Sequence, residues 1–313
     1  MWGLVASRLA CRVLKPLLRA HERRRAVRVI ELQEHTDIDA RTWARWLAGT
    51  DGLLFVGHRR RAPRTSLPGP FLKDPTGRTV PVGWLPDLGE GLQCFASNAA
   101  RVVDRQDDVR GPLALLGQWD ARYLHLAERM ESNLRSNGRM PFPIFRWTSE
   151  RIMRDDLVKA LRLGLGLAIY FGHGRSKGWA GYHGLRAEHL TEEPGEPLGA
   201  LLSITCLTAS RWRVGLSFLE KVVLGGAAAG TVGAVSRVKH VDNMRWMLGL
   251  ARALREGALC LGQALAQAAP DDDRAQAAYR IIGDPMAPML GTIQGLSRAV
   301  RVRAPAPDES IGS

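Results

Sequence analysis

Residues 167–174 have the sequence Leu-Ala-Ile-Tyr-Phe-Gly-His-Gly, and residues 200–206 have the sequence Ala-Leu-Leu-Ser-Ile-Thr-Cys. Apolar runs of this length, closed by glycine or a polar residue, are typical of strands buried in a parallel sheet. Ligands of such sheets bind beyond the carboxyl ends of the strands. We therefore expect His173 and Cys206 to lie side by side at one sheet edge, the pairing that nucleophilic thiol catalysis requires.

Strands and helices alternate along the second part of the chain. Strands are expected over 112–117, 142–146, 166–172, 200–206, 227–236 and 279–283, and helices over 120–136, 149–163, 214–224 and 242–268. This alternation predicts an α/β fold with a mostly parallel sheet and right-handed crossovers.

The first hundred residues are less regular. We expect a basic amphipathic helix over 5–25, strands over 27–32 and 53–57, and a surface loop over the proline- and glycine-rich residues 63–77. The charged stretch 104–108 marks the expected boundary between two parts. The predicted organisation is a basic N-terminal helix (1–25), an N-terminal α/β subdomain (26–105), a catalytic subdomain (106–300) and a disordered tail (301–313).

The composition is that of an ordinary globular protein. The 313 residues are 45% apolar and 24% charged, enough for one large domain or two modest ones. Four widely spaced cysteines without a C-x-x-C pair argue against a disulfide framework or a zinc knuckle and favour a reducing compartment. Because no apolar stretch could cross a bilayer and the N-terminus does not resemble a secretory signal, we expect a soluble, cytoplasmic protein.

Positive charge is concentrated near the N-terminus. The net charge is +13, and the basic residues there are Arg8, Arg12, Lys15, Arg19, Arg23, Arg24, Arg25 and Arg28. Such a segment suits an acidic partner, an anionic membrane surface or nucleic acid. We favour a solvated, arginine-rich helix and do not expect nucleic-acid binding, because neither stacking aromatics nor a known nucleic-acid module accompanies the charges.

Five segments, taken in order, resemble those of a known family. They are VPVGWLP (80–86), GLGLAIYFGHG (164–174), LLSITCLTAS (201–210), GGAAAGTVGAV (225–235) and YRIIGDPMAPML (279–290). Together they resemble the gingipain-type cysteine peptidases, which share the caspase-like fold with caspases, separase and bacterial CHAT-domain proteases. Two positions depart from the pattern. Trp84 stands where arginine is usual, and Thr205 stands where alanine usually precedes the nucleophile.

The resemblance implies a caspase-like three-layer sandwich with a mostly parallel central sheet, preceded by a smaller α/β subdomain. It implies a cysteine endopeptidase in which His173 is the catalytic histidine and Cys206 the nucleophile. We expect no cofactor and identify no metal-ligating residues, and the sequence leaves metal dependence open. The backbone N–H groups of Gly174 and Cys206 would bind the oxyanion. By analogy with caspase-like relatives, we expect regulated cleavage of a protein substrate in a defence or cell-death pathway, with a regulatory protein partner.

Residues around this pair are further candidates. Asp120 follows the expected strand 112–117 and is at the correct end of the sheet to orient His173. Candidate walls of the substrate pocket are Arg175, Lys177 and Trp179, then Thr208, Arg211 and Trp212, and finally Ser236, Arg237, Lys239 and Asp242. Arg237 and Lys239 favour an acidic substrate side chain and Asp242 a basic one. We favour the interpretation that all three are solvated loop charges, and the sequence does not decide the specificity.

Other histidines, cysteines and one aspartate are weaker candidates for a catalytic or metal-binding role. His58 also follows an apolar strand, whereas His183 and His189 lie between the two decisive strands without the spacing of a metal site. Cys94 and Cys260 have the pattern of core residues, and Asp284 in Gly-Asp-Pro is expected to form a turn.

A second hypothesis belongs to another class of protein. Single cysteines and histidines at strand ends are most often structural, so only their pairing favours catalysis. The alternative is therefore a catalytically inactive caspase-like module that binds an acidic partner through its basic N-terminus.

Overall fold

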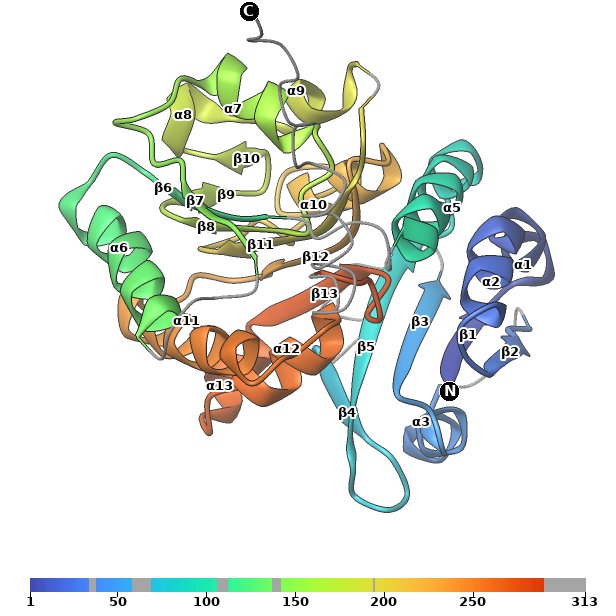
Figure 1. Ribbon diagram of the computed structural model, residues 1–313. Coiled ribbons are helices and arrows are strands. Elements are labelled where there is room, and N and C mark those ends of the chain that lie inside the picture. The colour runs from blue at the N-terminus through green and yellow to red at the C-terminus, as the bar shows by residue number, and fades with distance from the viewer. Residues whose placement is uncertain (34–37, 58–68, 106–111, 137–141, 194, 290–313) are drawn as a thin grey trace, which may run out of the picture.

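The computed structural model describes residues 1–33, 38–57, 69–105, 112–136, 142–193 and 195–289. Its centre is an 11-stranded sheet with helices on both faces (Figure 1). The strands of this sheet are β1 (Trp2–Ala6), β2 (Val27–Glu31), β3 (Gly52–Gly57), β4 (Phe71–Lys73), β5 (Thr79–Pro86), β6 (Leu113–Gly117), β7 (Ile144–Arg146), β8 (Leu167–Phe171), β11 (Leu198–Ile204), β12 (Ala228–Ala234) and β13 (Tyr279–Gly283). Their order is β2-β1-β3-β5-β13-β12-β11-β8-β6-β7, with β4 paired to β5.

The helices form a layer on each side of the sheet. They are α1 (Arg8–Val13), α2 (Lys15–Glu22), α3 (Ala40–Leu47), α5 (Gly89–Asp104), α6 (Ala121–Arg135), α7 (Arg154–Leu161), α8 (Gly181–Gly184), α9 (Ala187–Thr191), α10 (Phe218–Leu224), α11 (His240–Arg255), α12 (Leu261–Ala268) and α13 (Asp273–Ala277). Helices α2 and α10 pack on α5 on one face, whereas α6 and α12 pack on α11 on the other (Figure 1). The predicted α/β class and mostly parallel sheet are confirmed.

Strand β13 joins the two expected subdomains into one sheet. It runs parallel to β5 and antiparallel to β12, so β3 and β5 run opposite to β8, β11 and β12. A Cβ at Gly83 would lie 2.1 Å from the carbonyl oxygen of Gly283, so the approach of these strands requires glycine. The carboxyl ends of β6, β8, β11 and β12 therefore meet at one edge, the edge where the sequence predicts the site.

The N-terminal segment corrects the expected helix over 5–25. Residues 2–6 form the fully buried strand β1, and helix begins only at Arg8, where Ser7 Oγ accepts a hydrogen bond from the N–H of Ala10 at 3.1 Å. The five residues of β1 contain no charged side chain, so this segment suits a buried strand better than an amphipathic helix. The helical part is also divided, into α1 and α2, which meet at Leu14.

The expected helix over 242–268 is likewise two helices. Helix α11 ends at Arg255, and Gly257 has a left-handed φ of 87°, the conformation that often terminates a helix. Helix α12 begins at Leu261. The chain thereby turns back, and α12 packs along α11.

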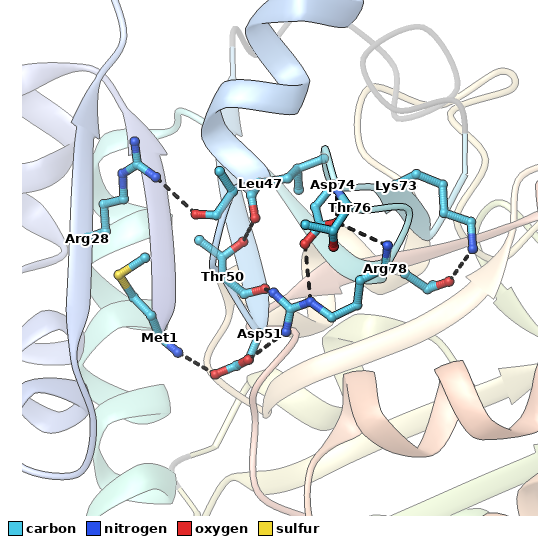
Figure 2. Close-up of polar contacts among 11 residues, drawn as sticks. Met1, Arg28, Leu47, Thr50, Asp51, Lys73, Asp74, Thr76 and Arg78 are labelled. Atoms are coloured by element: carbon cyan, nitrogen blue, oxygen red, sulfur yellow. Dashed lines mark hydrogen bonds and ion pairs between the residues drawn. The ribbon is translucent and has the colours of Figure 1, made fainter.

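The hairpin of β4 and β5 lies partly in the expected surface loop 63–77. In its turn, Asp74 accepts hydrogen bonds from Thr76 and Arg78, and these bonds, that of the Thr76 hydroxyl first, lower the pKa of Asp74 to about 2. Arg78 also contacts Asp51, whose carboxylate pairs with the N-terminal ammonium of Met1 (Figure 2). These contacts tie the hairpin to the beginnings of β1 and β3.

A buried hydrogen-bonded pair connects helix α2 to the end of β13. His21 Nε2 lies 2.8 Å from Asp284 Oδ2, and both side chains are fully buried. Trp2 stacks on the His21 ring and donates from Nε1 to Asp284 Oδ1 at 2.9 Å, and the N–H of Met286 donates to the same oxygen. Burial would raise the pKa of Asp284, but the charge and hydrogen bond of His21 hold it below its ordinary value. Asp284 therefore forms its turn and also joins β1 and α2 to the segment after β13.

Within the described residues, no helix is long and apolar enough to cross a membrane.

Candidate active site

Two adjacent parallel strands position the histidine and the cysteine. Strand β8 pairs with β11 with Phe171 opposite Ile204, and His173 and Cys206 each follow two residues later. Both line one cavity of about 720 Å³, and His173 is exposed whereas Cys206 is half-buried. The structure thus brings together the two side chains that the sequence pairs.

The backbone around Cys206 is closely packed. A Cβ at Gly174 would lie 2.4 Å from the carbonyl oxygen of Cys206, so glycine after the histidine is needed for this approach. The Cys206 thiol lies 3.6 Å from the carbonyl oxygen of Val238, to which it can donate, and its sulfur accepts from the N–H of Val238 at 3.4 Å. Within the described residues, the N–H of Cys206 donates to no protein acceptor, so it can serve a bound oxyanion.

Three residues hold His173 in place. The Tyr123 hydroxyl lies 3.3 Å from His173 Nδ1, and the two rings meet edge to face at 5.2 Å. The backbone N–H of His173 donates to Gln118 Oε1 at 2.7 Å, and Tyr170 donates its hydroxyl to the His173 carbonyl at 3.3 Å. Burial raises the pKa of Tyr123, so its hydroxyl stays neutral and can donate to Nδ1 or accept from it.

Asp120, the expected orienting residue, has other partners. It caps helix α6 by accepting from the N–H of Arg122 at 3.0 Å, and it pairs with the Arg122 guanidinium at 3.1 Å. These hydrogen bonds lower the pKa of Asp120, with a smaller contribution from the charge of His173. The sequence therefore identified the correct sheet edge, but the side chain in contact with Nδ1 is Tyr123.

We expect Tyr123→Phe to lower kcat by roughly 2- to 10-fold and to leave KM unchanged. A loss of this size corresponds to one hydrogen bond of ordinary strength. The phenylalanine ring keeps the edge-to-face contact, so only the hydroxyl is lost. Steady-state kinetics on a cleaved peptide measure the effect, with Asp120→Asn as the matched comparison. A larger loss in Asp120→Asn than in Tyr123→Phe would return the orienting role to Asp120.

Comparison with known proteins identifies the family. Residues 96–290 match the model of Peptidase family C25. The chain belongs to this family. Its members are cysteine endopeptidases of the gingipain type, so the resemblance predicted from five segments is confirmed. No curated protein matches the chain.

Solved structures share the fold of this C25 chain. The crystal structure of the Arg-specific cysteine proteinase gingipain R (RgpB) has a TM-score of 0.71 at 11% identity, covering 93% of this chain and 78% of that chain. The complex of Porphyromonas gingivalis RgpB pro- and mature domains has a TM-score of 0.68 at 12% identity, covering 93% of this chain and 80% of that chain. The predicted caspase-like architecture is thereby confirmed.

The candidate wall residues of the C25 chain occupy different places. Of the ten, Arg175, Lys177, Trp212 and Arg237 line the cavity. Trp179 is 2% exposed, stacks on Tyr170 at 4.2 Å and donates to Ser203 Oγ at 2.8 Å. It is therefore a buried packing residue and does not line this cavity. Asp242 lies in the first turn of α11, 3.5 Å from Arg245, and is not among the lining residues.

The remaining reactive candidates lie away from the cavity. His183 is exposed in a left-handed turn, and His189 Nδ1 accepts from the N–H of Arg186. Cys94 belongs to α5, and Cys260 is buried at the start of α12. His58 lies outside the described residues.

A buried polar cluster explains Trp84, the departure from the family pattern. Trp84 donates from Nε1 to Glu220 Oε1 at 3.1 Å, and Glu220 is fully buried. Glu220 also accepts from Arg211 Nε at 2.9 Å and Nη2 at 2.6 Å, and it caps α10 together with Ser217. This cluster anchors the segment after Cys206, whose residues Trp212, Arg213 and Val214 line the cavity.

Proposed function

We propose that Cys206 is the nucleophile and His173 the general acid and base of this C25 endopeptidase, with the N–H groups of Gly174 and Cys206 as the oxyanion hole. The observation that carries the proposal is the shared cavity at the ends of β8 and β11. The free N–H of Cys206 within the described chain supports the oxyanion assignment.

The proposed reaction has two stages. The Cys206 thiolate attacks the carbonyl carbon of the scissile bond, and the oxyanion accepts hydrogen bonds from the two N–H groups. The C–N bond then breaks as His173 protonates the leaving amine, which leaves a thioester on Cys206. Water attacks the thioester while His173 takes its proton, and the carboxylate product and the thiol are released.

We also propose that the enzyme acts in a reducing, intracellular compartment on a protein partner in a regulated pathway. All four cysteines are free thiols, which suits such a compartment.

Labelling with a thiol-reactive peptide electrophile tests the assignment of the nucleophile. We expect Cys206 to be modified at least roughly tenfold faster than the other cysteines, because burial raises the pKa of Cys11 and of Cys260 and reduces their thiolate fraction. Mass spectrometry of the digested protein maps the labelled residue.

Two variants complete this experiment. Cys206→Ala removes the label and the peptidase activity, whereas Cys94→Ala keeps both. Preferential labelling of Cys94 or Cys260 would overturn the assignment. Activity retained in Cys206→Ala would do the same.

A further inference from the structure

The cavity beside Cys206 carries positive charge alone among its lining residues. Besides His173, the lining contains four cationic side chains, those of Arg175, Lys177, Arg213 and Arg237. It includes neither aspartate nor glutamate. All four are exposed, and none forms an ion pair with a carboxylate of the described residues. A cleft lined by charges of one sign concentrates ligands of the opposite sign.

These cations lie close to the reacting groups along the chain. Arg175 and Lys177 follow His173 by two and four residues, and Arg213 belongs to the segment after Cys206. Arg237 precedes Val238, whose N–H contacts the Cys206 sulfur at 3.4 Å. Because all of them line the cavity that holds His173 and Cys206, a substrate side chain next to the attacked carbonyl would meet them.

The loop after His173 also places a buried serine in the cavity wall. Ser176 lines the same cavity and is 6% exposed, and its Oγ has no hydrogen-bond partner within the described residues. The backbone of Ser176 is fixed, since its carbonyl accepts from the N–H of Phe218 at 2.8 Å. Because this Oγ is itself buried, Ser176 forms part of the cavity wall and is not counted among the groups that bind a carboxylate.

Arg237 and Asp242, the residues that favour opposite substrate charges, differ in their position relative to the cavity. Arg237 faces the cavity, whereas Asp242 lies beside Arg245 on α11. Arginine offers a planar fork that binds a carboxylate through two hydrogen bonds, and the surrounding cations disfavour a basic side chain.

We propose that this peptidase selects substrates with aspartate or glutamate at the residue whose carbonyl is attacked, and that Arg237 and Arg213 bind that carboxylate. The inference rests on the proposed function and adds the substrate class. It differs from the Arg-specific activity named for the related gingipain R.

Matched fluorogenic peptides that differ at this residue alone test the proposal. We expect kcat/KM for aspartate or glutamate to exceed that for asparagine, glutamine or arginine by roughly 10- to 100-fold, the effect of a charged hydrogen-bonded pair. Arg237→Gln and Arg213→Gln should each reduce the ratio of aspartate to asparagine by roughly tenfold. Arg245→Gln, an exposed residue outside the lining, should leave the ratio unchanged.

The outcomes separate this inference from the proposed function. A preference for arginine or for a neutral residue, with Cys206 still labelled, would overturn the acidic specificity and leave the nucleophile assignment intact. An acidic preference that persists undiminished in both arginine variants would also overturn it. Absence of cleavage together with absence of labelling at Cys206 would refute the proposed function and the inference with it.

Discussion

Replacement of His173 by alanine is expected to lower kcat/KM by roughly 10²- to 10⁴-fold, the usual contribution of a general acid and base. The imidazole is the side chain that lines the cavity with Cys206 and can move a proton between the sulfur, the leaving amine and water. His173 is exposed, so its removal leaves no cavity in the core, and the melting temperature should stay within a few degrees of that of the wild type.

Peptide cleavage and thermal unfolding, measured on the same preparation, separate the two effects. His125→Ala is the matched control, because His125 is an exposed histidine on α6 that does not line the cavity. It should retain full activity. A His173→Ala enzyme with more than a tenth of the wild-type kcat/KM would contradict the role of this residue.

Replacement of Asp284 by asparagine is expected to lower the free energy of unfolding by about 1.5–3 kcal/mol, the usual value of a buried hydrogen bond to a charged group. His21 would lose its carboxylate partner in a fully buried position, where water cannot replace it. Trp2 and the N–H of Met286 also donate to this carboxylate, so the loss reaches β1, α2 and the segment after β13. Urea unfolding monitored by tryptophan fluorescence gives the change.

The control for Asp284 is an exposed ion pair between the end of α2 and the end of α5. Arg23 pairs with Asp104, and both side chains are about half-exposed. Asp104→Asn should therefore cost about 0–1 kcal/mol, as exposed pairs do. Equal effects of the two substitutions would contradict the structural role of the buried pair.

Acid should weaken the wild type more than Asp284→Asn. The pKa of Asp284 in the folded protein lies below its ordinary value of about 3.9. Its contribution to stability is therefore complete above that pH and is lost as the pH falls through the lower folded value. Unfolding free energies measured below about pH 4 should converge for the two proteins.

Much of the fold could be predicted where burial is continuous along the chain. Strand β13 has the predicted bounds Tyr279–Gly283, because its apolar run ends at a glycine. Strand β1 was missed, because Val5 also fits the helical spacing of the residues that follow. The antiparallel placement of β13 beside β12 depends on pairing between distant segments, which local periodicity does not report.

The part of the site that lies at the ends of strands could be predicted from the sequence. His173 and Cys206 follow runs that are buried on both faces, so their edge of the sheet could be inferred. Tyr123 could not be distinguished from a core residue of α6, since an aromatic residue on an apolar helix face has the same pattern. The bond from Trp84 to Glu220 spans 136 positions and has no local signal.

Strand β13, the last strand of the described residues, occupies the middle of the sheet. Until residues 279–283 are synthesised, β5 and β12 each lack the neighbour that covers one of their edges. Unpaired edges of this kind invite association with other chains. A nascent or truncated copy without these residues would therefore hold two half-sheets with unpaired edges, and the complete sheet can form only after residues 279–283 have been synthesised.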